Sequence, residues 1–396
     1  LHLSLGSRLE AAGKTEEAID ALRTGAERCP ESAPLWRALG VLREASDQGD
    51  EALDAYSRAV SLDERDYLSL VGTARVLRKR GESSEAVVSF EKAAAARPDE
   101  AEPLEALSAL RQELGDREGA VEALKALGGV RPLSTEEQET LGTLQGALGR
   151  YEESVGALEQ AVRDKPEDLS CVLELVRAYE HLGRHGAIIA PLSRALGPSP
   201  DHAEGQLRLG RAYVEEGRDE DAAAPLERSA ELSPAAETYE LLAGVFDRLG
   251  RRSALIAALE QLSKLRPEDL PLLERIGKLC SEEDLVDRAI VALEGAWALG
   301  ASAEAVRRLG DLYLEKAQAH AAAGDRVEAA AALERCAERC PEETDLLLEG
   351  TRCYLKLEMF TEAATLGGRA LESSPEGAQA AALADLVAEA RTKLGE

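Results

Sequence analysis

The chain has 396 residues, of which 44% are apolar and only 3% are aromatic, and its formal charge is -28 at pH 7. This excess of carboxylates excludes proteins that wrap a nucleic-acid backbone or lie on an anionic membrane surface, because both functions need clustered cations. No run of apolar residues approaches the roughly 18 needed to cross a bilayer, so we expect no membrane insertion and a cytoplasmic location.

Prolines and glycines recur in the sequence at a regular spacing. Prolines recur every 34 residues from Pro98 to Pro234, and Pro30 lies two periods earlier. A second series stands about seventeen residues ahead of the prolines, at Gly13, Gly81, Gly115, Gly149, Gly183, Gly217, Gly250 and Gly324. Glycine readily ends a helix in the left-handed conformation, and proline cannot continue one. Two such marks in each period predict two helices of about a dozen residues per repeat.

Large and small apolar residues recur between these marks in a fixed order. In the second period they are Trp36, Leu39, Gly40, Ala52, Tyr56 and Ala59. This order resembles the tetratricopeptide repeat family, whose 34-residue units carry Trp, Leu, Gly, Tyr and Ala at the same offsets. The resemblance covers essentially the whole chain. It implies an all-α fold, a right-handed superhelix of about eleven helix-turn-helix repeats that leaves a concave groove.

The period divides residues 1–377 into repeats. They are 1–32, 33–66, 67–100, 101–134, 135–168, 169–202, 203–235, 236–269, 270–303, 304–343 and 344–377. The first repeat lacks its first two positions, so we expect repeats or a cap to continue upstream. Residues 378–396 are expected to form a last, solvating helix. The repeat at 304–343 is six or seven residues longer, in an alanine-rich segment after Tyr313, and predicts a lengthened first helix in a protruding helix pair.

Few residues have the spacing that catalysis or metal binding needs. No P-loop, GxGxxG, HExxH or GxSxG motif occurs, so we expect no enzymatic activity and no cofactor. Cys336 and Cys340 lie four residues apart, but no second pair of ligands follows, and they occupy slots that are apolar in other repeats; core packing is therefore expected. His181 and His185 are separated by Gly183 at a helix-ending position, which argues against a metal site there.

Two prolines depart from the periodic series. Pro191 and Pro225 fall at the same offset in adjacent repeats, within the expected second helix. A proline in a helix interior removes a hydrogen bond and costs about 3 kcal/mol, so one interpretation is a bend in the array. The interpretation that we favour is that both helices start late, after Gly186 and near Asp221, so that each proline occupies the tolerated first turn.

The resemblance further implies that the first helix of each repeat lines the groove. In the second and third repeats, the lining positions predict a partner-binding patch of Arg37, Val41, Leu68, Val71, Arg75, Arg78 and Lys79. The sixth and seventh repeats predict a second patch of Arg177, Leu207, Arg211 and Val214, and a third, more apolar patch contains Leu314, Leu348 and Leu355. An alternative role for the cations of the first patch is to complement the dipole at a helix C-terminus.

The sequence contains no asparagine. Members of the family that grip the C-terminal carboxylate of chaperones use a clamp of Lys and Asn, and others hold peptide backbones with a ladder of Asn. The matching positions hold Ser7, Val41, Arg75, Ala109 and Thr143. Chaperone tails are therefore not expected as partners. Recognition should instead use side-chain pockets and charge, for an amphipathic helix in the groove or a docked folded protein.

The sequence thus predicts a non-enzymatic protein-interaction scaffold or adaptor that binds a partner protein or amphipathic peptide on its concave face. Abundant Ala, Arg, Gly and Glu are typical of a GC-rich bacterial genome. Two alternatives remain open. In the first alternative, the array is a receptor for a small GTPase or a component of a bacterial secretion, pilus or polarity machine. In the second, it is the substrate-recognition arm of a larger enzyme whose catalytic domain lies outside this sequence.

Overall fold

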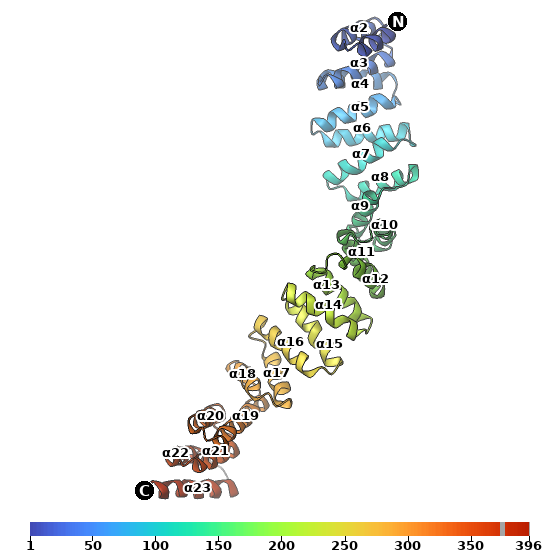
Figure 1. Ribbon diagram of the computed structural model, residues 1–396. Helices are drawn as coiled ribbons and strands as arrows, with labels where there is room; N and C mark the ends of the chain where they lie inside the picture. The colour runs from blue at the N-terminus through green and yellow to red at the C-terminus, as the bar shows by residue number, and fades with distance from the viewer. Residues whose placement is uncertain (373–376, 396) are drawn as a thin grey trace. The chain divides into compact units, whose positions relative to one another are not determined.

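The computed structural model describes residues 1–372 and 377–395, and every regular element within them is an α-helix (Figure 1). The helices group into two compact units, Leu1–Pro200 and Asp201–Glu396. Each unit is a stack of helix pairs in which every helix contacts the next. The all-α class expected from the sequence is confirmed.

The helices alternate as first and second members of pairs. In the first unit they are α1 (His2–Ala11), α2 (Thr15–Arg28), α3 (Ala33–Ala45), α4 (Gly49–Leu62), α5 (Tyr67–Lys79), α6 (Ser83–Ala96), α7 (Ala101–Glu113), α8 (Arg117–Val130), α9 (Thr135–Ala147), α10 (Tyr151–Asp164), α11 (Leu169–His181) and α12 (His185–Leu196). In the second unit they are α13 (Ala203–Glu215), α14 (Asp219–Leu232), α15 (Ala236–Arg248), α16 (Arg252–Leu265), α17 (Leu270–Glu282), α18 (Val286–Ala298), α19 (Ala303–Ala322), α20 (Arg326–Arg339), α21 (Thr344–Lys356), α22 (Phe360–Glu372) and α23 (Ala378–Leu394).

Glycine ends most of the first helices and lets the chain turn back. All eight glycines of the periodic series have a positive φ, between 66° and 82°. Glycine adopts this conformation without steric cost because it has no Cβ. The following N–H then bonds back into the helix, as Glu82 donates to the carbonyl of Leu77 at 3.0 Å. The predicted role of these glycines is confirmed.

Proline follows several of the second helices at a constant distance. The helices α6, α8 and α10 end two residues before Pro98, Pro132 and Pro166. Proline has no N–H to donate to the preceding turn, and its ring restricts the residue before it to extended conformations. The predicted stop signal is therefore confirmed at these three helices.

The helices α12 and α14 each contain an interior proline. Pro191 and Pro225 are the seventh residues of these helices, so the prediction that both helices start late is wrong. The first turn tightens ahead of each proline instead. The N–H groups of Ala187 and Asp221, four residues before the prolines, each donate to the carbonyl three residues earlier, at 3.1 Å. The surrounding repeats hold the helices in register despite the missing hydrogen bond.

Small residues on the first helices let the second helices approach closely. Tyr56 of α4 is fully buried between Gly40 of α3 and Gly72 of α5. A Cβ added at these glycines would lie 2.6 and 2.4 Å from ring atoms of Tyr56. The Tyr56 hydroxyl donates to Glu44 Oε2 at 2.6 Å. One aromatic ring thus joins three consecutive helices.

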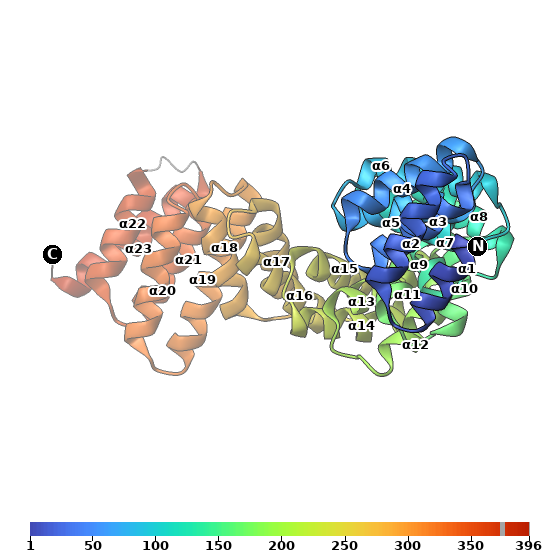
Figure 2. The ribbon, with the colours of Figure 1, turned by 90° about the horizontal axis from the view of Figure 1, so that it is seen from above.

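The helix α19 is longer than the other first helices. It has 20 residues, whereas α17 and α21 have 13. Its partner α20 keeps 14 residues, and α19 also packs against α21 (Figure 2). The predicted lengthening is confirmed, but it belongs to α19 alone and not to a helix pair.

The candidate metal ligands have structural roles. Cys336 and Cys340 are both 2% exposed, and their thiols donate to main-chain carbonyls of α19 at 3.4 and 3.2 Å. Burial raises the pKa of the Cys336 thiol to about 12, which opposes formation of the metal-binding thiolate. His181 stacks on Tyr151 with ring centroids 4.2 Å apart. Within residues 1–372 and 377–395, no cluster of three His, Cys, Asp or Glu is placed to hold a metal ion.

Candidate partner-binding site

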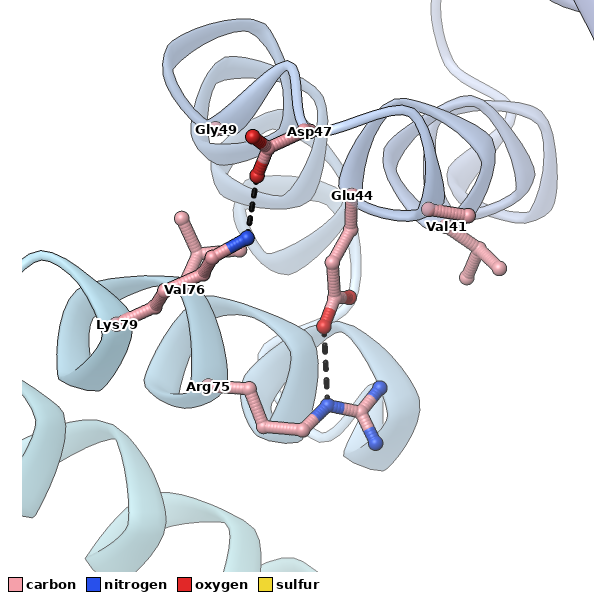
Figure 3. A pocket seen from close by; sticks show the side chains of 8 residues that line it. Val41, Glu44, Asp47, Gly49, Arg75, Val76 and Lys79 are labelled. Carbon is pink, nitrogen blue, oxygen red and sulfur yellow. Dashed lines mark hydrogen bonds and ion pairs between the residues drawn. The ribbon is translucent and has the colours of Figure 1, made fainter.

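A pocket of about 400 Å³ lies between α3 and α5, two consecutive first helices of the first unit (Figure 3). Its lining residues are Val41, Glu44, Ala45, Asp47, Gly49, Arg75, Val76 and Lys79. The structure therefore brings together three residues of the first predicted patch, Val41, Arg75 and Lys79. In Figure 3 the carboxylates project from the α3 side and the cations from α5.

Two ion pairs cross the pocket. Arg75 Nε bonds to Glu44 Oε1 at 3.1 Å, and Lys79 pairs with Asp47. Arg75 also reaches Glu102 of α7 at 3.3 Å. Burial by itself lowers the Arg75 pKa, but the charge and hydrogen bond of Glu44 together with the charge of Glu102 outweigh it, so the pKa lies above its usual value. The predicted patch is thus a paired surface that presents both signs of charge, not a free cationic one.

Exposed apolar side chains accompany these charges. Val41 on the pocket wall is 41% exposed, and Leu68 on the first turn of α5 is 49% exposed. Leu68 lies seven residues before Arg75, about two helical turns, and therefore shares its face of α5. Val76 also lines the pocket and is buried. The surface combines apolar anchors with charged groups on adjacent turns.

Two members of the first predicted patch serve the fold instead. Val71 is 2% exposed and belongs to the core with Leu70, so its assignment as a lining residue is wrong. The reason is that α5 packs against α3, α4 and α6 and buries more than one stripe. Arg37 bonds to Asp66 at 2.8 Å, and the Asp66 side chain is only 4% exposed. Arg37 therefore anchors the start of α5 from the neighbouring repeat.

Arg78 is the remaining cation of the first patch. It is exposed at the end of α5, and it has no ion-pair partner among the residues that the structure describes. Its position also complements the negative end of the helix dipole. Arg78 is consequently an exposed cation, unpaired within the described residues, next to Lys79 of the pocket, and its role in binding stays a prediction.

The second predicted patch is divided between the two units. Arg177 lies in the first unit and bonds to Glu174 at 2.9 Å. In the second unit, Arg211 pairs with Glu237 of the next first helix. Leu207 and Val214 are half-buried against the core of that unit. This patch stays a prediction.

Asp47 occupies a position at which most repeats have glycine. It is left-handed, with a φ of 60°, as are Asp284 and Glu358 at the equivalent point of two later repeats. A Cβ is disfavoured in this conformation, and a carboxylate opposes the dipole at a helix C-terminus. The hydrogen bond from Lys79 lowers the Asp47 pKa and keeps the carboxylate charged. Sequence reasoning missed Asp47, although the gap in the glycine series marked it.

Replacing Asp47 with glycine is expected to stabilise the first unit. The substitution relieves the left-handed backbone and removes a charge from the helix end, whereas the exposed pair with Lys79 contributes little. We expect the midpoint of thermal unfolding, followed by circular dichroism, to rise by a few degrees. The reverse change at an equivalent turn, Gly81→Asp, should lower it. A lower unfolding midpoint for Asp47→Gly than for the parent chain would contradict the interpretation that the left-handed backbone at Asp47 is strained.

Two tetratricopeptide repeat profiles match the sequence. One matches residues 38–103, 140–203 and 189–237, and the other matches residues 1–42. Together they span half of the chain. The chain belongs to the tetratricopeptide repeat family. Tetratricopeptide repeats are interaction modules, so this membership supports a protein-interaction scaffold.

Solved structures of other proteins are similar to this chain. A chain in the structure of Naa15/Naa10 bound to HypK-THB matches with a TM-score of 0.50 at 14% identity, covering 99% of this chain and 65% of that one. YrrB, a TPR protein with an unusual peptide-binding site, matches with a TM-score of 0.39 at 16% identity, over 47% and 96% of the two chains. A tetratricopeptide repeat protein from Parabacteroides merdae ATCC 43184 matches with a TM-score of 0.36 at 18% identity, over 62% and 97%.

This chain therefore spans 65% of the length of the first of these proteins, which is less than two thirds. At 14% identity the likeness to this first protein shows the fold alone. No protein with curated annotation matches the sequence. Among the described helices, none has both the length and the apolar character that crossing a bilayer requires.

Proposed function

We propose that this chain is a non-enzymatic interaction scaffold whose first unit binds a partner protein or an amphipathic peptide over the α3–α5 pocket. The observation that carries the proposal is the pocket itself, in which an exposed apolar wall at Val41 adjoins two ion pairs. Leu68 extends the apolar surface along α5. Interfaces derive most of their affinity from a few side chains, arginine among them, that surrounding contacts shield from water, and this surface provides Arg75 beside the apolar Val41 and Leu68.

The ion pairs favour exchange with a partner. Arg75 and Lys79 are each exposed and already face carboxylates from the neighbouring repeat. Exposed ion pairs contribute little to stability, so a partner carboxylate can replace Glu44 or Asp47 without a large loss. Opposite charges on the two walls also favour one orientation of a bound segment, because like charges repel it in the reverse orientation.

The test compares two equally exposed apolar residues of the first unit. Leu68 of α5 and Val88 of α6 are both 49% exposed, but only Leu68 lies on a first helix. The immobilised chain is used to capture proteins from a lysate of its source organism, and bound proteins are quantified by mass spectrometry. We expect Leu68→Glu to reduce capture of the partner at least about tenfold and Val88→Glu to leave it unchanged.

Circular dichroism must show the same helix content for both variants. Equal loss in the two variants would indicate a general effect of the added charge. No loss in Leu68→Glu would remove this surface as the binding site.

A further inference from the structure

A second kind of groove lies between consecutive second helices. In the second unit, a groove of about 520 Å³ separates α14 from α16 above α15 and is lined by Glu227, Ala230, Glu231, Tyr239, Leu242, Phe246, Ala254, Ala257, Ala258 and Gln261. In the first unit, α4, α5 and α6 form a corresponding groove of about 630 Å³, lined by Ser57, Val60, Ser61, Glu64, Leu70, Thr73, Ser89 and Lys92. Stacking of helix pairs therefore forms the groove, and the side chains decide what it binds.

Side chains at equivalent helix positions give the two grooves different chemistry. The α14–α16 groove has Glu227, Glu231, Ala258 and Gln261 where the α4–α6 groove has Ser57, Ser61, Ser89 and Lys92. It also has Leu242 in place of Thr73. The groove of the second unit is therefore more apolar at its base and more acidic at its rim than its counterpart.

The base of the α14–α16 groove is apolar. Leu242 and Phe246 are 3% and 4% exposed, and alanines of α16 leave the space above them open. Tyr239 is half-buried, and within the described residues its hydroxyl has no hydrogen-bond partner. By contrast, the hydroxyls of Tyr56 and Tyr313 donate to carboxylates at 2.6 and 2.7 Å. The groove offers an apolar floor and one unused hydroxyl.

The rim of this groove is acidic. Glu231 bonds to Arg228 at 2.7 Å, whereas Glu227 has no ion pair within the described part of the chain. None of the lining residues is a cation. The whole chain carries a net charge of -28, which attracts basic partners at long range. Charge and shape together select a ligand that is cationic at its edges and apolar at its centre.

We propose that the α14–α16 groove binds a basic amphipathic segment of a partner protein. A leucine or phenylalanine side chain of the segment enters the groove over Phe246, and lysines or arginines that flank it face Glu227 and Glu231. The Tyr239 hydroxyl donates to a carbonyl or side chain of the segment. This surface uses other helices than the α3–α5 pocket, and it gives the scaffold a second binding site.

The experiment measures binding of a synthetic 14-residue helical peptide of leucine and lysine, labelled with fluorescein, by fluorescence anisotropy. In Ala257→Arg, a long cation occupies the groove and repels the peptide lysines. The matched control is Ala224→Arg, because Ala224 and Ala257 are both exposed and are the sixth residues of α14 and α16, but Ala224 does not line this groove. We expect Ala257→Arg to weaken binding at least about tenfold and Ala224→Arg by less than about twofold.

Two further peptides separate shape from charge. A peptide with serine in place of leucine should bind at least about tenfold more weakly than the leucine and lysine peptide, and one with glutamate in place of lysine should not bind. Equal affinity of the serine peptide, or equal loss in the two arginine variants, would overturn the proposal, because either result means attraction by net charge alone. The proposal would also be overturned if the parent chain formed a dimer and Ala257→Arg abolished it, because the groove would then bind a second copy of this chain. Circular dichroism checks that both variants keep the helix content of the parent chain.

Discussion

The Tyr56→Ala variant should lose about 4 kcal/mol of unfolding free energy in the first unit. The ring is fully buried, and its neighbours on both sides are Gly40 and Gly72. Neither glycine has a side chain that can move into the space left by the ring, so the cavity stays open and adds its cost to that of the lost apolar burial. Burial also raises the pKa of Tyr56, so its hydroxyl stays protonated and continues to donate to Glu44.

Urea unfolding followed by circular dichroism measures this loss. In a repeat array each helix pair contacts only its neighbours, so the loss of stability should stay within the first unit. We therefore expect the first unit to unfold at a lower urea concentration and the second unit to unfold at an unchanged one. Tyr56→Phe keeps the ring and removes only the hydrogen bond to Glu44, and should lose about 1 kcal/mol. A loss below about 1 kcal/mol for Tyr56→Ala would refute the role of the ring as the centre of this core.

Replacing Pro225 with alanine should stabilise the second unit by about 2 kcal/mol. The new N–H of residue 225 can donate to the carbonyl of Asp221, and the clash between that carbonyl and the proline ring disappears. Part of the roughly 3 kcal/mol associated with an interior proline is offset, because alanine gives the unfolded chain more freedom. Pro191→Ala should act in the same direction in the first unit, because the two prolines occupy the same position in their helices.

Pro271→Ala in the same unit is the control for Pro225→Ala. Pro271 lies in the first turn of α17, where no intrahelical hydrogen bond is missing. Alanine should therefore give no gain there and change the stability by less than about 0.5 kcal/mol. If Pro225→Ala proved no more stable than the parent chain in urea, the surrounding repeats would have removed the strain that we assign to α14.

The ends of the helices could be predicted from the sequence because they depend on local properties of the backbone. The left-handed φ of Gly81 and the missing N–H of Pro98 act on their own helix ends, so a regular spacing of such residues was enough to predict paired helices. The same local reasoning failed at Pro191 and Pro225, where packing of the neighbouring repeats holds a helix through its proline.

The sequence by itself determined the all-α class, the paired helices and the longer α19. Only the tertiary structure decided that Val71 is core, that Arg37 anchors Asp66, and that Arg75 is paired with Glu44 and Glu102. The physical reason is distance along the chain. A helix and its ends depend on residues a few positions apart, whereas each of these ion pairs joins residues 27 to 31 positions apart. A chain rich in carboxylates offers every arginine many partners, and only packing can choose among them.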